Sequence, residues 1–262
     1  MLRIKYTVFF LVLVALVNIT VPKIYAKKEN KTTVAKNSQT VDAKVKIIEN
    51  EKEEPSYNVN QYGIIQEELI NAATPVPLIT GDKELDDAVS EILAETTNDM
   101  MSNYEKIIMT YLYIEQNYRY KYSRAKTTVE YVSDYDKFIV EHAKGMTVYG
   151  CGDCANFTAL FVVCARAIGL ECYSIEGEYK GSGHYWAEIV LDGTRYIFDP
   201  EADFRASENR GTIRLLYFCI NEESDMFDNY YPYHEQKDID SFNKFFTRSP
   251  ADTSASDNSE TH

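Results

Sequence analysis

Basic side chains are scarce in this chain of 262 residues. Lysine and arginine together number 27, against 41 aspartates and glutamates, which gives a formal net charge of −14 at pH 7. A chain with this excess of negative charge is repelled by the phosphate backbone of DNA and RNA. We therefore expect no nucleic-acid partner.

Histidine is also sparse, and the four residues are scattered along the chain at His142, His184, His234 and His262. A structural zinc site needs a second pair of ligands at similar spacing beside a close pair of cysteines. Cys151 and Cys154 form a close pair, but the sequence offers no second pair of that kind. We expect no bound metal and no other cofactor.

The number of cysteines is five, which is odd. In an exported protein, an odd count leaves at least one thiol free or bonded to another molecule, and this favours a reactive cysteine. Cys164 lies inside an apolar run and is expected in the core. Cys172 and Cys219 lie in expected strands, where they could pair with each other or be buried.

No apolar run reaches the roughly 20 residues that a membrane-spanning helix needs. The N-terminal stretch MLRIKYTVFFLVLVALVNITVPKIYAKK has basic residues, an apolar run from about Val8 to Val17, then Pro22 and the small residue Ala26. This order predicts a secretory signal peptide over residues 1–26, cleaved near Ala26, and hence a secreted, extracellular protein without a stable membrane span. An uncleaved segment that anchors the protein to a membrane is the alternative.

Composition divides the rest of the chain into three parts. Residues 27–57 are dominated by Lys, Glu, Asn and Thr, and residues 248–262 are small, polar and acidic. Neither stretch can bury enough apolar surface to offset the entropy lost on ordering. We expect a disordered charged linker at 27–57, a folded domain at 58–247 and a disordered acidic tail at 248–262.

The first half of the folded part carries three helical patterns before the cysteine pair. GDKELDDAVSEILAETT has Asp82 as a cap, and SNYEKIIMTYLYIEQN begins with Ser102 and Glu105 at the spacing of a capping box. The third, SDYDKFIVEHAKG, is shorter and is expected to end at Gly145.

The fourth helix is expected directly after the cysteine pair. CANFTALFVVCARAI, residues 154–168, is apolar on nearly every face and is followed by Gly169, which is typical of a helix surrounded by protein. Asp153 is the expected N-cap and places Cys154 in the first turn. Backbone N–H groups and the helix dipole stabilise a thiolate there.

After Gly169 the pattern changes to strands, expected at residues 171–179, 184–191, 194–199 and 215–220. The Asp-Gly link at 192–193 is a strong hairpin signal. If it forms the turn, Leu191 pairs with Thr194, and His184 and Asp199 lie on one face as diagonal neighbours. A slip of one residue would place them on opposite faces.

These residues together suit thiol chemistry. A thiol at its ordinary pKa of about 8.5 is mostly protonated at neutral pH, so an imidazole must accept its proton. A carboxylate must then orient the imidazole and stabilise its cation. Cys154, His184 and Asp199 would fill these roles.

The stretch GDCANFTALFVVCARAIGLECYSIEGEY, followed by GHYWAEIVLDGTRYIFDPE, resembles the transglutaminase-like superfamily of papain-like thiol enzymes. In that family a Gly-x-Cys heads the central helix, and three strands follow it. The His of an HxW element opens the second of these strands, and the Asp of a DP element ends the third. The resemblance covers roughly residues 104–200. It implies Cys154 as nucleophile, His184 as base and Asp199 as the residue that orients the base.

The expected fold is α+β, with a papain-like or transglutaminase-like core in which the buried catalytic helix packs on a small antiparallel sheet. The expected function is acyl transfer or hydrolysis at an amide bond of a protein or peptide substrate, associated with the cell surface or cell wall. The sequence does not choose between water and an amine as acceptor. The backbone N–H of Cys154 is one expected donor to the oxyanion, and Tyr149 is a candidate for the other.

Two other interpretations stay open. The CGDC pair is also typical of a thioredoxin-like redox motif, although the segment before Cys151 is predicted as helix and loop rather than as part of a βαβ unit. A non-catalytic binding module at the cell surface is the other possibility. The acidic flanks and the tyrosine clusters YRYKY (118–122) and NYYPYH (229–234) favour it, because tyrosine offers an apolar face with a polar tip.

Overall fold

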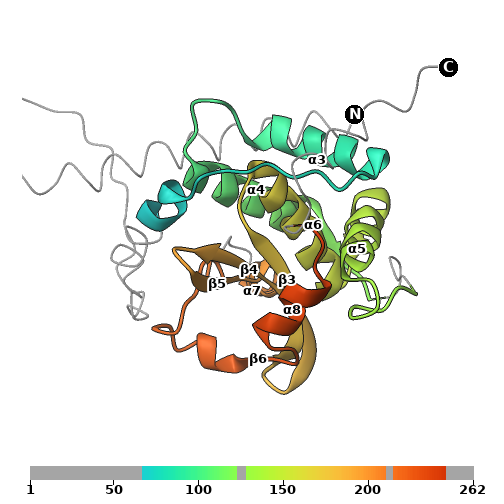
Figure 1. The fold of residues 1–262 in the computed structure, drawn as a ribbon, viewed down its shortest axis with the longest axis vertical. Helices are drawn as coiled ribbons and strands as arrows, with labels where there is room; N and C mark the ends of the chain where they lie inside the picture. The colour runs from blue at the N-terminus through green and yellow to red at the C-terminus, as the bar shows by residue number, and fades with distance from the viewer. Residues whose placement is uncertain (1–66, 123–127, 211–214, 246–262) are drawn as a thin grey trace, which may run out of the picture. The chain divides into compact units, whose positions relative to one another are not determined.

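The computed structural model describes residues 67–122, 128–210 and 215–245 (Figure 1). The predicted signal peptide at 1–26, linker at 27–57 and tail at 248–262 lie outside the described residues, as do both ends of the predicted domain at 58–247. Within the described ranges, no helix combines the length and the apolar character needed to cross a membrane.

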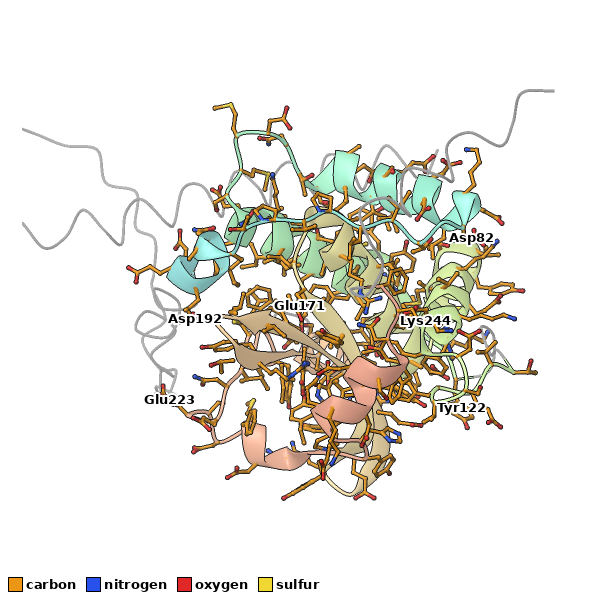
Figure 2. The ribbon with its side chains drawn as sticks, viewed as in Figure 1. Asp82, Tyr122, Glu171, Asp192, Glu223 and Lys244 are labelled. Atoms are coloured by element: carbon orange, nitrogen blue, oxygen red, sulfur yellow. The ribbon has the colours of Figure 1, made fainter. Side chains whose placement is uncertain are left out.

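The helices α3 (Lys83–Thr96) and α4 (Asn103–Asn117) begin where their capping residues predict. The Asp82 carboxylate accepts a hydrogen bond of 3.0 Å from the Leu85 N–H, and Ser102 and Glu105 form a complete capping box. These bonds satisfy backbone N–H groups that have no partner inside the helix. Asp82, labelled at the start of α3 in Figure 2, also forms an ion pair of 3.0 Å with Lys144.

The helix α5 (Tyr135–Tyr149) is longer than predicted. The expected end at Gly145 is wrong, because the helix continues to Tyr149 and is capped by Gly150, whose φ is 66°. Met146 lies in this last turn and is fully buried. Burial of such a side chain outweighs the roughly 1 kcal/mol that a glycine costs inside a helix.

The central helix α6 (Cys154–Ile168) has the predicted ends. Nearly all of its side chains are buried, and it packs against α3, α4, α5 and α7 (Pro200–Arg210) as well as the sheet. Figure 1 shows α3, α4, α5 and α6 gathered together beside the sheet. This packing explains why its sequence is apolar on nearly every face.

The main sheet is antiparallel throughout and has the strand order β5-β4-β3-β6, formed by β3 (Cys172–Tyr179), β4 (Ser182–Leu191), β5 (Thr194–Phe198) and β6 (Tyr230–Pro232). Leu191 pairs with Thr194, as the Asp-Gly turn predicts. Asp192 and Gly193 have φ values of 49° and 74°, the left-handed conformation of a tight hairpin turn. The α+β class and the packing of a buried helix on a small antiparallel sheet are confirmed.

The strand predicted at 215–220 is wrong. This segment forms one isolated bridge, between Ile220 and Ile197 of β5, and Cys219 has a φ of 57° that interrupts any extended strand. Phe218, Cys219 and Ile220 are buried. The end of the apolar run at 215–220 therefore belongs to the core without forming a strand. Periodicity alone does not distinguish these two cases.

Several short elements were not predicted. The strands β1 (Arg119–Tyr120) and β2 (Cys151–Gly152) form a parallel pair outside the main sheet, and Tyr120 is paired with Gly152. The helix α7, a 3₁₀ turn η1 (Phe227–Asn229) and the helix α8 (Gln236–Phe242) follow later in the chain. The β1–β2 pair matters for the site, because it fixes the loop that leads into α6.

Replacing Gly169 by alanine is expected to lower the free energy of unfolding by about 3 kcal/mol. Gly169 has a φ of 106°, and an added Cβ would lie 2.7 Å from both Pro75 Cβ and the Val76 nitrogen. The variant therefore adds a steric clash to backbone strain. Urea denaturation measures the loss. Gly181→Ala is the matched control, since its φ is 75° and nothing lies within 4 Å of the added Cβ; equal losses in the two variants would refute the clash.

Candidate active site

Cys154 is the first residue of α6 and is partly exposed, whereas the following residues of the helix are buried. Asp153 is the N-cap, and its carboxylate accepts a hydrogen bond of 3.2 Å from the Ala155 N–H. The thiol thus stands at the positive end of a helix dipole, at the surface of the core. Anionic groups are stabilised at that position.

The glycine before the cysteine has a packing role. A Cβ on Gly152 would lie 2.4 Å from the Cβ of Asn156, in the first turn of α6. The Asn156 side chain accepts a hydrogen bond from the Asp153 N–H and donates one of 2.9 Å to the His142 carbonyl. Gly152 therefore lets the loop close over Asn156, and this fixes the start of α6 with its cysteine.

His184 lies near the start of β4, and its neighbour ties that strand to α6. The Thr158 hydroxyl of α6 donates a hydrogen bond of 3.0 Å to the Tyr185 carbonyl of β4. The Cys154 side chain interacts with His184 closely enough to help raise the pKa of the imidazole. His184 is only 9% exposed, so its ring is largely enclosed by protein.

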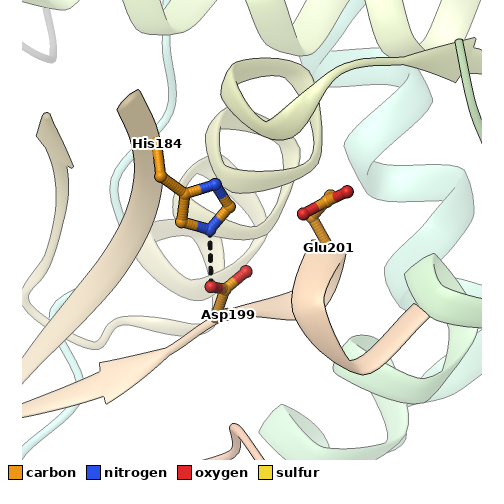
Figure 3. A group of neighbouring side chains, drawn as sticks. All are labelled: His184, Asp199 and Glu201. Atoms are coloured by element: carbon orange, nitrogen blue, oxygen red, sulfur yellow. Dashed lines mark hydrogen bonds and ion pairs between the residues drawn. The ribbon is translucent and has the colours of Figure 1, made fainter. Parts of the chain in front are cut away.

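Asp199 follows β5 directly and is fully buried. Its Oδ2 lies 2.6 Å from His184 Nε2, the contact drawn in Figure 3. The same oxygen accepts a hydrogen bond of 2.8 Å from the Tyr230 hydroxyl, and Oδ1 accepts one of 3.0 Å from the Ala202 N–H. The carboxylate is therefore held in one orientation by three donors from different elements.

The electrostatics of the pair follow from this arrangement. Burial disfavours the charged imidazole, but the charge and the hydrogen bond of Asp199, with a further contribution from Cys154, outweigh it and raise the pKa of His184 to about 11. Burial and the charge of Asp199 raise the pKa of Tyr230 far above its ordinary value. Tyr230 is thus a neutral hydroxyl donor, and His184 carries a proton at neutral pH.

Glu201 lies beside this pair, in the first turn of α7, and is 3% exposed (Figure 3). Burial and the charge of Asp199 raise its pKa above the ordinary value for a glutamate. It forms an ion pair with Arg205, one turn further along the helix. Atoms of His184, Asp199 and Glu201 that could bind a metal lie within 4.8 Å of one another, but both carboxylates already accept bonds from protein donors.

The structure brings the three predicted residues together: Cys154 contacts His184, which contacts Asp199. Cys151 lies three residues away in β2 and is also partly exposed; Cys164, Cys172 and Cys219 are buried, and none of the five cysteines is in a disulfide. The possible pairing of Cys172 with Cys219 is therefore not formed. Tyr149 ends α5 and is 56% exposed, and its role as an oxyanion donor stays a prediction.

The residues that sequence reasoning missed are Tyr230, Glu201, Arg205 and Tyr120. Tyr230 belongs to the cluster NYYPYH, whose composition favours only a binding module. Proline directly after Asp199 is a common first residue of a helix, and that signal could have placed Glu201 and Arg205 four residues apart on α7. The contacts of Tyr120 and Tyr230 span long stretches of chain and have no local signal.

Comparison with known proteins gives a family match, and it covers Cys154, His184 and Asp199. Residues 90–200 match the model of the family described as the transglutaminase-like superfamily. No curated protein matches the chain. Among solved structures, a "putative cysteine protease" from Cytophaga hutchinsonii is 19% identical with a TM-score of 0.35, over 51% of this chain and 42% of that one. A structure described as a TGase is 16% identical with a TM-score of 0.35, over 64% of this chain and 43% of that one. The matched part thus spans less than half the length of either protein.

Proposed function

We propose, from the premise that the chain carries a transglutaminase-like domain at residues 90–200, that this protein is an exported thiol enzyme acting on an amide bond of a protein or peptide. The observation that carries the proposal is the series of contacts from Cys154 to His184 to Asp199, with the thiol partly exposed and the other two side chains buried. A substrate can reach the sulfur, while the groups that activate it are shielded from water.

The reaction would begin from an ion pair in which the proton of the Cys154 thiol already resides on His184. The thiolate then attacks the amide carbonyl, and the backbone N–H of Cys154 donates to the developing oxyanion. As the C–N bond breaks, the imidazolium protonates the leaving amine, and a thioester remains on Cys154. Water or a second amine then attacks the thioester and loses its proton to His184, the sulfur leaves as thiolate, and the thiolate–imidazolium pair is restored.

Asp199 acts through His184 in this scheme. Its carboxylate accepts the hydrogen bond from Nε2, which leaves Nδ1 as the ring nitrogen able to face the sulfur. The Tyr230 hydroxyl and the Ala202 N–H keep the carboxylate from rotating away. A fixed carboxylate stabilises the imidazolium formed when the thiol loses its proton.

A second candidate function is the non-catalytic binding module at the cell surface. One observation favours it: Tyr231 and Tyr233 are 60% and 55% exposed beside the sheet edge formed by β6. Exposed tyrosines are common in contact surfaces for proteins and peptides. Such a module needs no reactive thiol, so the reactivity of Cys154 separates the two functions.

Alkylation of the native protein by iodoacetamide at pH 6.5 is expected to modify Cys154 first. Because the imidazolium of His184 stabilises the thiolate, its rate should exceed that of Cys151 by about tenfold or more. Burial raises the pKa of the Cys172 thiol to about 12, and Cys164 and Cys219 are also buried, so these three are internal controls that should stay unmodified. Peptide mapping by mass spectrometry gives the site and rate. Equal labelling of Cys151 and Cys154 would favour the binding module.

A further inference from the structure

The helix α7 places a positive charge next to the candidate nucleophile. Arg205 forms an ion pair with Glu201 through its Nε, and its guanidinium lies 4.3 Å from the centre of the Tyr120 ring. These two contacts hold the side chain from two sides. Arg205 is therefore fixed by the fold rather than being a mobile surface residue.

Both partners of Arg205 belong to the immediate surroundings of Cys154. Tyr120 is paired with Gly152, two residues before the cysteine. Glu201 lies beside His184, which interacts with Cys154. Electrostatic interactions with the Cys154 thiolate are present for Arg205 and for Tyr120, which places the guanidinium and the sulfur in one neighbourhood.

The two side chains of the Glu201–Arg205 ion pair differ in their exposure to solvent. The side chain of Glu201 is 4% exposed, whereas that of Arg205 is 54% exposed. A buried carboxylate thus anchors a guanidinium that reaches out to solvent beside the thiol. The planar guanidinium is well suited to binding a carboxylate through two parallel hydrogen bonds.

We propose that Arg205 determines substrate specificity by binding a carboxylate of the acyl donor, next to the amide that Cys154 attacks. This inference rests on the proposed function and names its substrate class. The substrate is a peptide with a free carboxylate, on a side chain or at its C-terminus, adjacent to the scissile amide. Glu201 and Tyr120 are positioning residues that hold the guanidinium near the sulfur.

The rival explanation is that Arg205 only stabilises the thiolate. That role would change the reactivity of Cys154 toward neutral and anionic reagents alike. A carboxylate-binding residue instead acts only on reagents that carry a carboxylate. The ratio of two alkylation rates therefore separates the explanations, because any effect on the sulfur itself cancels.

The test compares iodoacetate with iodoacetamide on the full chain. In both reactions the Cys154 thiolate attacks the CH₂ carbon, a C–S bond forms and iodide leaves, so the reagents differ only in carboxylate against carboxamide. Arg205→Gln is expected to lower the ratio of the iodoacetate rate to the iodoacetamide rate by about tenfold, the loss of one charge-assisted contact. The wild-type ratio should also fall as NaCl rises from about 0.02 to 0.5 M.

Arg195→Gln is the matched control. Arg195 also pairs with an acidic residue, Glu188 at 3.6 Å, and its guanidinium lies 4.4 Å from the centre of the Tyr173 ring. It influences the buried Cys172, whereas Arg205 influences Cys154. This variant removes the same charge from the chain and should leave the ratio at the wild-type value.

An unchanged ratio in Arg205→Gln would overturn the proposal, and so would an equal fall in Arg195→Gln. If Arg205→Gln does not fold, a salt-independent ratio in the wild type refutes the proposal and a salt-dependent ratio that survives in Arg205→Lys supports it. Selective labelling of Cys154 with an unchanged ratio would leave the proposed enzyme function intact, whereas loss of selective labelling would refute both. Protection of Cys154 by N-acetylglycine or by N-acetylaspartate amide distinguishes a terminal from a side-chain carboxylate.

Discussion

The variant Cys154→Ala is expected to lose all covalent catalysis, with turnover falling by about 10⁴-fold or more. The thiol is the only group in the proposed reaction that forms a bond to the substrate, so no other side chain can replace it. Alanine is a good helix former, and position 154 is partly exposed, so the fold should persist. p-Nitrophenyl acetate is a suitable probe, because a burst of p-nitrophenolate and an acetyl group on Cys154 report the acyl-enzyme.

The variant Cys151→Ala is the control for this experiment. Cys151 is also partly exposed and lies only three residues earlier, but it belongs to β2 rather than to the first turn of α6. It should keep the burst and the labelling of Cys154. In oxidising buffer its activity should be equal to or above that of the wild type, since a disulfide between the two cysteines can no longer mask the nucleophile. An inactive Cys151→Ala with an active Cys154→Ala would replace the proposed enzyme by a redox protein.

The variant His184→Ala is expected to lower the alkylation rate of Cys154 and the turnover of p-nitrophenyl acetate by about a thousandfold at pH 6.5. In the wild type, Asp199 raises the pKa of His184 to about 11 against the effect of burial, so the imidazolium persists across the neutral range and stabilises the thiolate. Without the ring, the thiol proton must go to solvent, and the neutral thiol predominates.

The alkylation defect of His184→Ala should depend on pH. The stabilisation supplied by a group with a raised pKa is present below its ordinary value near 6.5 and is lost as the pH rises through the value in the folded protein, here about 11. The defect of His184→Ala in alkylation should therefore be largest near pH 6.5 and shrink steadily toward pH 10, where hydroxide removes the thiol proton. A defect of constant size from pH 6 to 10 would contradict the imidazolium–thiolate pair.

His234→Ala is the matched control for the histidine variant. His234 is stacked on Tyr131 with 5.5 Å between ring centres, and its Nε2 lies 3.4 Å from Glu176. It is thus a partly buried histidine with a carboxylate partner, as His184 is, but in a different part of the molecule. Its removal should leave the pH profile of Cys154 alkylation unchanged.

Local capping and turn chemistry made a large part of this fold predictable from the sequence. Asp82 and Asp153 each satisfy an N–H of the helix that follows, so the starts of α3 and α6 depend on residues that are neighbours in the chain. The register of β4 and β5 likewise depends on the two residues of the turn between them. That register was sufficient to predict that His184 and Asp199 meet, and the distance of 2.6 Å between them confirms it.

The sequence did not reveal features that depend on packing between distant segments. Gly145 carries a stop signal for α5, but burial of Met146 decided that the helix continues. Residues 215–220 have the composition of a strand. The last three of these side chains are buried in the core, but the segment forms only one isolated bridge and no regular strand pairing. In both cases the apolar packing free energy exceeded the local preference of the backbone.

The surroundings of the candidate site also came only from the tertiary structure. Tyr230 reaches Asp199 across 31 residues, and Arg205 meets Tyr120 across a still longer stretch of chain. Such contacts are set by how α7, β1 and β6 pack around α6, and no cap, turn or periodicity encodes them. The sequence by itself determined that Cys154 begins a helix and that His184 and Asp199 share one face of a hairpin, because the cap and the turn are local features. Only the tertiary structure decided which tyrosine holds the carboxylate and which arginine lies near Cys154, because these contacts depend on long-range packing.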